Sequence, residues 1–505
     1  MRPPFLRPRI MRAAFLPLAL VGIGARTANA ADFAPARLDL GGKIKAVRAR
    51  DLDGDGRADL IVLVERREPD RLPVTELVLL HAPKVPASGT FFGAENTVRV
   101  PCSGDAAGGR ASAGAVAIGR FGPKGEVRLR FLGPAATPDL ASDGSPVADS
   151  ASTACILERS PGEALAFWEG VADVDGDGRD ECFVPGTDGS IDVLGVTIPP
   201  TETASRSDDE LFVRSSRSPR LTFSDLDGDG IAEILRIEGD HLVVEQVKTA
   251  KSPALTERIS LAKILAPDPS RPPEELHAPR ITIADVNGDR KADLLVTLIH
   301  GRADKLGGLR TSFYFFPGPF YDAATGALVE SSSRIDTESV ALHPRFVDLD
   351  GDGDLDYVVD SIRGKMFDLI KRVTGAEPTI WYTAFRFDQA AKRFEKEPYC
   401  DVERPYSGPE ARANTFGRSG FCEGDFDGDG VRDLLDLGNL TKLVILKGTK
   451  GDDAFTSPLL AGISAPSNAT FVADAVIADL NGDGRSDAVL TSDRTLLLVV
   501  SKGAK

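Results

Sequence analysis

The sequence predicts an all-β protein, a closed β-propeller of four-stranded antiparallel blades, with eight units favoured and seven possible. Three observations support this prediction. A short acidic motif recurs seven times along the 505-residue chain, short β-branched apolar runs flank most copies, and the motif starts lie about 61 residues apart or twice that. A repeat of this length that carries several short strands indicates propeller blades or a solenoid.

Composition narrows the classes of protein that fit. Hydrophobic residues make up 42% of the chain, so a large core is possible and global disorder is excluded. The 50 glycines and 34 prolines imply many turns. The chain has 76 acidic and 60 basic residues, a net charge of −16, which disfavours nucleic acid because phosphate binding needs a basic surface. Metal ions are the first candidate to balance this surplus of acid.

The first thirty residues predict a cleavable signal peptide. Four arginines precede an apolar run of 12 residues at 13–24, and Ala28-Asn29-Ala30 forms an A-x-A cleavage site. The run is too short to span a bilayer, although a buried N-terminal helix is an alternative. We therefore expect residues 1–30 to be removed and residues 31–505 to form one propeller domain. The mature protein should reach the periplasm, the cell surface or the medium as a monomer that is not integral to the membrane.

The cysteines bear on possible disulfide bonds. The chain contains Cys102, Cys155, Cys182, Cys400 and Cys422. Disulfides are permitted in an exported protein, but an odd number leaves at least one cysteine unpaired or paired between chains. Cys400 and Cys422 flank a turn-rich segment and are the favoured pair. No C-x-x-C occurs, so neither a zinc knuckle nor a thioredoxin-like site is indicated.

The repeated motif, D-x-[DN]-G-D-[GR]-x-x-[DE], carries oxygen ligands at positions 1, 3, 5 and 9 of a tight loop. The candidate metal ligands, copy by copy, are Asp51, Asp53, Asp55 and Asp59; Asp173, Asp175, Asp177 and Glu181; Asp225, Asp227, Asp229 and Glu233; Asp285, Asn287, Asp289 and Asp293; Asp348, Asp350, Asp352 and Asp356; Asp425, Asp427, Asp429 and Asp433; and Asp479, Asn481, Asp483 and Asp487. The 26 carboxylates in this set account for the acid surplus of the chain.

Oxygen ligands at alternate positions can converge on one hard cation, and glycine at positions 4 and 6 permits the positive φ of so sharp a loop. The absence of sulfur and imidazole disfavours zinc and copper, and magnesium demands a stricter octahedron. Calcium is therefore the predicted metal, at up to seven sites. The alternative is that the Asp and Gly clusters are only solvated turns, which would not place the position-9 carboxylate so regularly.

Apolar runs before and after the motif predict the strands that the loops connect. In chain order we expect strands at 36–40, 44–48 and 60–64, at 280–284 and 294–298, at 345–347 and 357–359, and at 475–478, 488–490 and 495–501. These runs are short and rich in β-branched residues. A short helix is expected at 361–374, where apolar residues recur near helical spacing.

An EF-hand loop begins in the same way, but it needs a bidentate Glu at position 12 and a helix on each side. Position 12 is apolar in most copies, as at Val62, Val296 and Leu490. Because strands rather than helices are expected on both sides, the EF-hand and dockerin interpretations are disfavoured.

The first interval between motifs is 122 residues, twice the usual spacing, so one repeat is hidden. Residues 115–132 have the strand, glycine turn and strand of the other units, without a loop carboxylate before Glu126. We interpret this segment as a degenerate unit that binds no metal. The strand at 36–40 should complete the last blade, because closure of the ring hides both sheet edges. A solenoid would instead need polar caps, which the sequence does not indicate.

The motif, its flanking strands and its period resemble the FG-GAP/VCBS repeats of integrin-α-type β-propellers over residues 33–501. The resemblance implies a propeller with calcium bound at motif positions 1, 3, 5 and 9. This chain departs from the pattern at Arg290, which replaces the second glycine of the fourth copy, and at Asn287 and Asn481, which each remove one charge. The fourth site should therefore be weaker than the other six.

Two classes of function remain open. The leading hypothesis is a non-enzymatic binding or adhesion module for an extracellular protein or polysaccharide. The alternative is an enzyme on the same scaffold, such as a polysaccharide lyase or phosphodiesterase. No catalytic residue is predicted, because the five histidines are scattered and no H-E-x-x-H, G-x-S-x-G or P-loop motif occurs. The aromatic run at 313–316 could stack on sugar rings, although packing between blades is the favoured interpretation.

Overall fold

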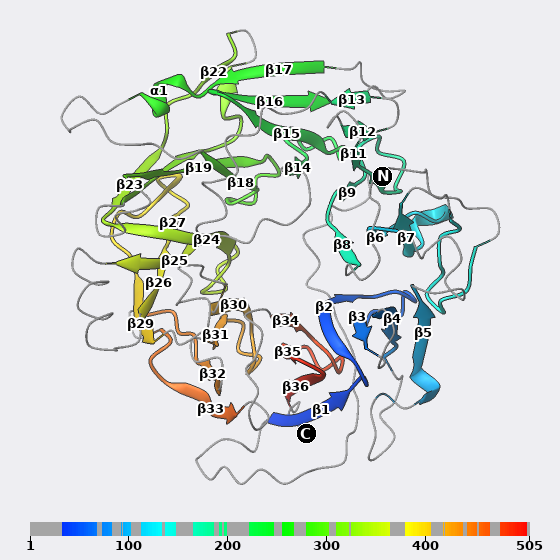
Figure 1. The fold of residues 1–505 in the computed structure, drawn as a ribbon. Helices are drawn as coiled ribbons and strands as arrows, with labels where there is room; N and C mark the ends of the chain where they lie inside the picture. The colour runs from blue at the N-terminus through cyan, green and yellow to red at the C-terminus, as the bar shows by residue number, and fades with distance from the viewer. Residues whose placement is uncertain are drawn as a thin grey trace.

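The structure, a computed structural model, describes residues 33–67, 73–82, 92, 94–102, 113–133, 137–147, 165–185, 191–193, 196–198, 222–246, 255–266, 279–301, 310–322, 325–363, 379–405, 418, 420–437, 442–451, 454–464 and 475–501. Its strands form a ring of sheets, a β-propeller (Figure 1). The all-β prediction is therefore confirmed. Residues 1–30, the predicted signal peptide, lie outside the described residues.

Seven antiparallel blades are present in this part of the chain. The first contains β2 (Lys43–Arg50), β3 (Asp59–Arg66), β4 (Val74–Leu80) and β5 (Thr97–Pro101). The second contains β9 (Val171–Ala172), β10 (Glu181–Cys182), β11 (Val184–Pro185), β12 (Ile191–Val193) and β13 (Val196–Ile198), where only Phe183 separates β10 from β11. The third contains β14 (Thr222–Ser224), β15 (Glu233–Glu238), β16 (His241–Gln246) and β17 (Leu255–Ser260), extended by β22 (Ala327–Leu328) and β21 (Tyr321–Asp322).

The remaining blades continue around the ring. The fourth contains β18 (Arg280–Ala284), β19 (Asp293–His300), β20 (Arg310–Phe316) and β23 (Ser333–Thr337), and the fifth contains β24 (Ser339–Val347), β25 (Asp356–Arg363), β26 (Thr379–Phe385) and β29 (Cys400–Pro405). The sixth contains β30 (Gly420–Gly424), β31 (Asp433–Asp436), β32 (Lys442–Leu446) and β33 (Pro458–Ser464). A hairpin of β27 (Phe387–Asp388) and β28 (Arg393–Phe394) contributes Phe387 and Phe394 to a buried cluster with β20 and β25, and the one-turn helix α1 (Ala262–Leu265) follows β17.

The seventh blade joins the two ends of the chain. Its strands β34 (Ala475–Ala478), β35 (Asp487–Ser492) and β36 (Thr495–Ser501) are completed by β1 (Phe33–Asp39). β1 runs antiparallel to β36, with Phe33 opposite Ser501 and Asp39 opposite Thr495. Closure by an N-terminal strand, as the sequence predicts, is therefore confirmed (Figure 1).

The degenerate unit forms a smaller sheet between the first and second blades. It contains β6 (Ala115–Gly119), β7 (Arg128–Leu132) and β8 (Ala166–Trp168), and β6 pairs antiparallel with β7 but parallel with β8. The favoured count of eight antiparallel blades is thus corrected to seven plus this mixed sheet. On its other edge β7 has only an isolated antiparallel bridge, in which Leu129 and Leu140 exchange two backbone hydrogen bonds (3.0 and 2.8 Å), so no further named strand extends the sheet there among the described residues.

The core lies between neighbouring blades. Val62 of β3 and Val489 of β35 belong to one buried apolar cluster, and Leu63 of β3 and Phe131 of β7 belong to another. Each blade is therefore apolar on both faces, which explains the continuous apolar runs of its second strand. No helix within the described ranges is long and apolar enough to cross a membrane.

The aromatic run lies in β20 and is part of this core. Phe313, Phe315 and Phe316 are buried, and the ring centroid of Phe315 lies 4.8 Å from that of Phe394 in an edge-to-face arrangement. Packing between blades is confirmed for these three rings, and they are not available to stack on sugars.

Two expectations need correction. Cys400 in β29 and Cys422 in β30 are buried free thiols, so the favoured disulfide is not present, although both side chains belong to one buried apolar cluster. Burial raises the pKa of the Cys400 thiol to about 12. Residues 361–363, the start of the expected helix, instead end strand β25, and residues 364–374 lie outside the described part.

Candidate metal centres

The seven acidic loops occupy equivalent places in the seven blades. We number them in chain order: loop 1 (51–59), loop 2 (173–181), loop 3 (225–233), loop 4 (285–293), loop 5 (348–356), loop 6 (425–433) and loop 7 (479–487). Each loop connects the first strand of its blade to the second, and the residue at position 9 always begins that second strand. The predicted arrangement of strand, loop and strand is therefore confirmed for every copy.

Hydrogen bonds connect the loops of successive blades. The backbone N–H at position 8 donates to a carbonyl at position 1 or 2 of the preceding loop. Examples are Ala232 to Asp173 (3.3 Å), Leu355 to Val286 (2.9 Å), Arg432 to Leu349 (2.8 Å) and Ser486 to Asp425 (2.7 Å). The loops therefore lie together on one face of the ring, where a change in one loop can affect its neighbour.

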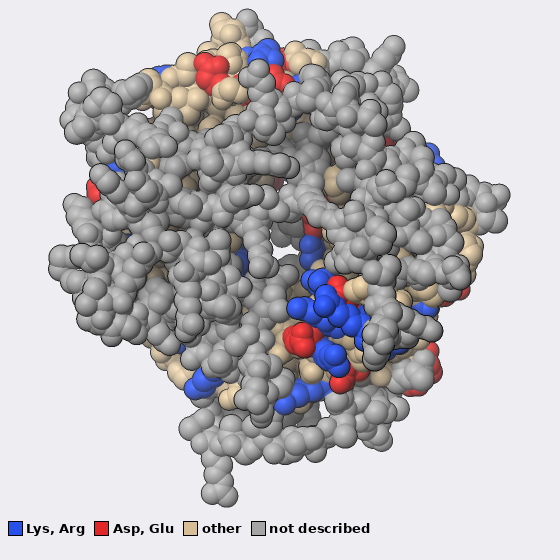
Figure 2. Space-filling view, in the orientation of Figure 1, with Lys and Arg blue, Asp and Glu red and all other residues tan. Residues whose placement is uncertain are grey.

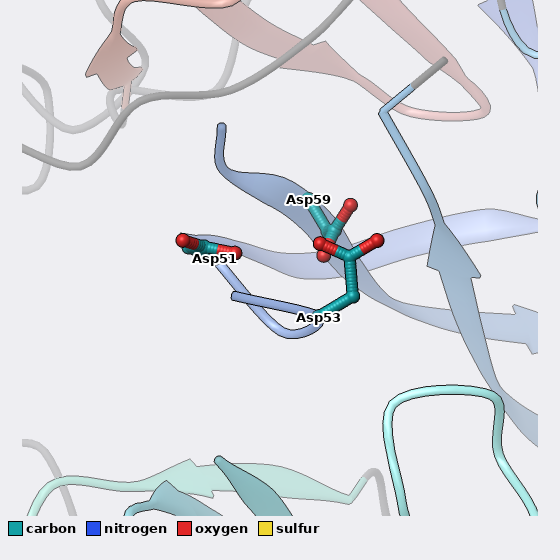
Figure 3. A group of neighbouring side chains, drawn as sticks. All are labelled: Asp51, Asp53 and Asp59. Carbon is teal, nitrogen blue, oxygen red and sulfur yellow. The ribbon is translucent and has the colours of Figure 1, made fainter. Parts of the chain in front are cut away.

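Five loops bring three carboxylates together in the way that a cation requires. In each group the oxygen atoms lie within 4.8 Å of one another. The groups are Asp51, Asp53 and Asp59; Asp173, Asp175 and Glu181; Asp225, Asp227 and Asp229; Asp348, Asp350 and Asp352; and Asp425, Asp427 and Asp433. Figure 3 shows loop 1, where Asp53 extends toward Asp59 at the start of β3. Loops 4 and 7 carry Asn287 and Asn481 at position 3, so they have one carboxylate fewer.

The membership of each group depends on whether a cationic side chain engages position 5. Arg57 binds Asp55 and Arg179 binds Asp177, and in both loops the group consists of positions 1, 3 and 9. In loops 3 and 5, position 7 is Ile231 or Asp354, and the position-5 carboxylate joins the group. In the sequence, this difference is visible as the arginine at position 7 of loops 1 and 2.

Carboxylates in the loops also accept hydrogen bonds from the loop backbone. In loop 1 the N–H groups of Gly54 and Gly56 donate to Asp51 Oδ1 (2.7 Å) and Oδ2 (2.9 Å). The same contacts recur at Asp173, Asp225, Asp425 and Asp479. These Asx-type contacts stabilise the turn by themselves. A carboxylate oxygen has a second lone pair, so the same groups can still bind a metal ion.

Within the seven loops that the structure describes, two buried carboxylate oxygens have no hydrogen-bond partner. They are Asp350 Oδ1 in loop 5 and Asp285 Oδ1 in loop 4, and Asp350 is only 7% exposed. An unsatisfied buried carboxylate oxygen is costly, and a bound cation would satisfy it. The other oxygen of Asp350 lies 3.3 Å from Arg386, so loop 5 already has a cation on one side. The donor set of loop 5 therefore fits a hard, oxygen-binding metal ion.

The position-9 carboxylate has a structural task that the sequence did not reveal. Asp59 Oδ2 accepts from the Leu52 N–H and Oδ1 from the Ala82 N–H, both at 2.9 Å. It therefore ties the loop to the end of β4. The same double contact occurs at Asp293, Asp356, Asp433 and Asp487.

Burial makes ionisation of these groups costly. Burial and, to a smaller extent, repulsion from the neighbouring loop carboxylates raise the pKa of Glu181, Glu233, Asp356 and Asp433 to about 7 and that of Asp293 to about 6. A divalent cation would favour the ionised form of each group.

Loop 4 keeps its turn despite the arginine at position 6. Arg290 adopts φ 71°, close to the 85° of Gly56 at the same position of loop 1. Its N–H donates to Asp285 Oδ2 (2.9 Å), as the glycines do elsewhere. A positive φ strains the backbone of a non-glycine residue. The loop therefore has the same shape as the others but includes a strained residue, and we still expect the fourth site to bind calcium more weakly.

Loop 6 contains an internal cation. Lys447, which follows β32, places its Nζ against Asp427 Oδ2 and 2.6 Å from Asp429 Oδ2. The two carboxylates raise the pKa of Lys447, so the ammonium stays charged. A metal ion in loop 6 would have to displace this ammonium group, so we expect loop 6 to bind calcium more weakly than loops 1, 2, 3 and 5.

Replacing Lys447 with methionine should strengthen calcium binding at loop 6 by about tenfold, the effect of removing one strong charge-assisted contact that competes with the metal. Calorimetric titration with calcium would show one site becoming tighter. Lys450→Met, an exposed change of the same charge three residues away, should leave the titration unchanged. Equal titrations for the two variants would contradict competition by Lys447.

Comparison with known proteins yields similar folds only. No protein-family model and no curated protein sequence matches this chain. Similar solved structures include the V. cholerae biofilm matrix protein Bap1 (11% identity, TM-score 0.39, covering 93% of this chain and 87% of that one). The exotype rhamnogalacturonan lyase YesX (16%, 0.42, 97% and 76%) and the Dos1 propeller (9%, 0.30, 78% and 93%) are also similar. At these identities and TM-scores the likenesses assign neither a family nor a function.

Proposed function

We propose that this protein is an exported calcium-binding propeller of the FG-GAP/VCBS type, which acts as a non-enzymatic binding or adhesion module. The observation that carries the metal part of the proposal is the group of three carboxylates that recurs in five blades, with atoms within 4.8 Å. The unsatisfied Asp350 Oδ1 points to the same conclusion. Export depends on the predicted signal peptide at residues 1–30.

Calcium has a structural task in this proposal. The loops of successive blades are connected by backbone hydrogen bonds. An ion in each loop would offset the repulsion among the carboxylates and fix the loops relative to one another. The ring would then be a stable platform on which a protein or polysaccharide ligand could bind. A glycan-array screen with and without chelator tests this part, and binding that is lost in chelator supports it.

Counting bound calcium in the purified protein tests the metal part directly. We expect up to seven ions, with loops 4 and 6 weaker than the rest. Asp53→Ala should remove one ion, because Asp53 belongs to the loop 1 group. Lys124→Ala in the degenerate unit should remove none, since no carboxylate group was found there among the described residues. Two or fewer ions per chain would mean that the Asp and Gly residues of the motif only stabilise the turns and mostly do not bind metal.

A further inference from the structure

Loop 7 differs from most other loops in how its own side chains meet. All five groups of three carboxylates include positions 1 and 3 of their loop. Loop 7 has Asn481 at position 3. Its three carboxylates, Asp479, Asp483 and Asp487, form no such group in the part of the chain that the structure describes. Position 3 is therefore where loop 7 departs from the predicted metal site.

The amide of Asn481 connects position 3 to position 5 and to the end of the last strand. Its Nδ2 donates to Asp483 Oδ2 (2.9 Å) and to the Ser501 carbonyl (3.0 Å), and its Oδ1 accepts from the Asp483 N–H (2.8 Å). A flipped amide would place its oxygen against two acceptors and its NH2 group against a donor, so these hydrogen bonds fix its orientation. A metal ion between positions 3 and 5 would therefore meet the N–H donors of Asn481 rather than a lone pair.

The carboxylates of loop 7 have donors within the fold. Asp479 Oδ1 accepts from the Gly482 N–H (2.7 Å) and Oδ2 from the Gly484 N–H (2.9 Å), and Asp483 Oδ1 accepts from the Arg485 N–H (2.9 Å). Among the described residues, no side-chain atom of loop 7 is both buried and without a hydrogen-bond partner, whereas loops 4 and 5 each have such an oxygen. Loop 7 is therefore satisfied without an ion.

Loop 4 has asparagine at the same position without this result. The Oδ1 of Asn287 accepts from the Asp289 N–H (2.9 Å), as in loop 7. Asn287 is only 6% exposed, yet its Nδ2 has no hydrogen-bond partner in the described part of the chain. Asparagine at position 3 is therefore not sufficient by itself. In loop 7 the amide is satisfied because Asp483 and Ser501 both accept from it.

Ser501 connects loop 7 to the closure of the ring. It is the last residue of β36, is fully buried, and lies opposite Phe33, the first residue of β1. Its N–H and Oγ donate to Asp487 Oδ1 (2.7 and 3.0 Å), while its carbonyl accepts from Asn481. The amide therefore fixes loop 7 to the strand with which the N-terminal strand pairs.

We propose that the Asn481 amide replaces a metal ion in loop 7, so that this loop binds no calcium and holds the closing blade together without it. Lys447 gives a partial precedent, because its ammonium group contacts positions 3 and 5 of loop 6. The inference rests on the proposed calcium function and lowers the largest expected number of ions from seven to six. Free calcium then controls the order of the other blades, while the two ends of the chain stay joined.

The test compares two variants at the same motif position, Asn481→Ala in loop 7 and Asp53→Ala in loop 1. Calcium content and melting temperature are measured, in calcium and in excess chelator. Asn481→Ala should keep every ion of the wild type. Its melting temperature should fall by about 2 °C or more and equally in both conditions, because the lost hydrogen bonds do not depend on calcium. Asp53→Ala should lose one ion, and most of its loss of stability should appear only in calcium.

Asn481→Asp should convert loop 7 into a metal site. Aspartate occupies position 3 in loops 1, 2, 3, 5 and 6, so this variant should fold. It should gain one ion. The new carboxylate would face Asp483 Oδ2 and the Ser501 carbonyl, so its melting temperature should fall in chelator and recover in calcium.

Ionic strength is held constant in these measurements. Figure 2 shows Lys and Arg gathered over β2, which packs against blade 7. Screening of these charges would otherwise change when chelator replaces calcium.

Three results would each overturn the proposal: loss of one ion in Asn481→Ala, no gain of an ion in Asn481→Asp, or a loss of stability in Asn481→Ala that appears only in calcium. Failure of the calcium function would instead show in Asp53→Ala, which would then lose no ion. Failure of the present inference would show only in the two Asn481 variants.

Discussion

Removal of calcium with excess chelator should lower the melting temperature of this protein strongly, and added calcium should restore it. Without metal, oxygen atoms of three carboxylates lie within 4.8 Å of one another in each of five loops, and these carboxylates repel. A ligand that binds only the native state stabilises it by about 2.7 kcal/mol per site when its free concentration is a hundred times Kd. Several such sites act on one ring, so the total effect should be large.

Thermal unfolding followed by circular dichroism or calorimetry measures this effect. Magnesium at the same free concentration is the control, and it should restore less stability because it requires a stricter octahedron and retains its waters. An unchanged melting curve in excess chelator would contradict the calcium interpretation.

The metal-free protein should also lose stability as the pH rises. Burial raises the pKa of Glu233, Asp356 and Asp433 to about 7 in the folded state, against about 4 in an unfolded chain. The folded state therefore holds these protons more tightly. The resulting stability is fully present below about pH 4 and is lost as the pH rises through about 7. In chelator the melting temperature should fall between pH 5 and 8, and calcium should remove most of this dependence.

Local pattern was sufficient to predict the strands that flank loops 1, 4, 5 and 7. β18, β34 and β36 have the predicted bounds, and β1 closes the ring. The doubled interval between the first two motifs located the degenerate unit. Its two strands and the glycine turn between them are recognisable in the sequence even though the acidic ligands are missing. The mixed sheet could not be predicted in the same way, since β8 joins β6 across more than forty residues of chain.

Contacts between residues far apart in the chain also explain why the sequence did not predict the ammonium group in loop 6 or the second hydrogen bond to the position-9 carboxylate. Lys447 lies 20 residues after Asp427 and approaches it only because β32 returns beside β31. The double contact of Asp59 was hidden because the Ala82 N–H is 23 residues away. A motif shows which oxygens can converge on a metal ion, and it does not show which backbone groups already use them.

That double contact predicts a large difference between two ligands of one loop. Asp59 is fully buried and accepts hydrogen bonds from the backbone N–H groups of Leu52 and Ala82, which are themselves buried residues. Asp59→Ala leaves both donors without a partner, which should cost about 3 to 5 kcal/mol of unfolding free energy even in chelator. Asp53→Ala removes an exposed carboxylate from the same group, so in chelator its cost should stay below about 1 kcal/mol.

Denaturant unfolding of both variants, with calcium and with chelator, separates the two tasks of the motif. Each variant should lose the loop 1 ion, and each should therefore gain less stability from calcium than the wild type. Only Asp59→Ala should remain destabilised when no variant holds metal. Asp59→Asn, which keeps one acceptor oxygen, should fall between them because one of the two N–H groups retains its partner. If Asp59→Ala matched Asp53→Ala in chelator, the position-9 carboxylate would be a metal ligand without a structural task. The hydrogen bonds from Leu52 and Ala82 argue against that result, since they join loop 1 to the end of β4 without any ion.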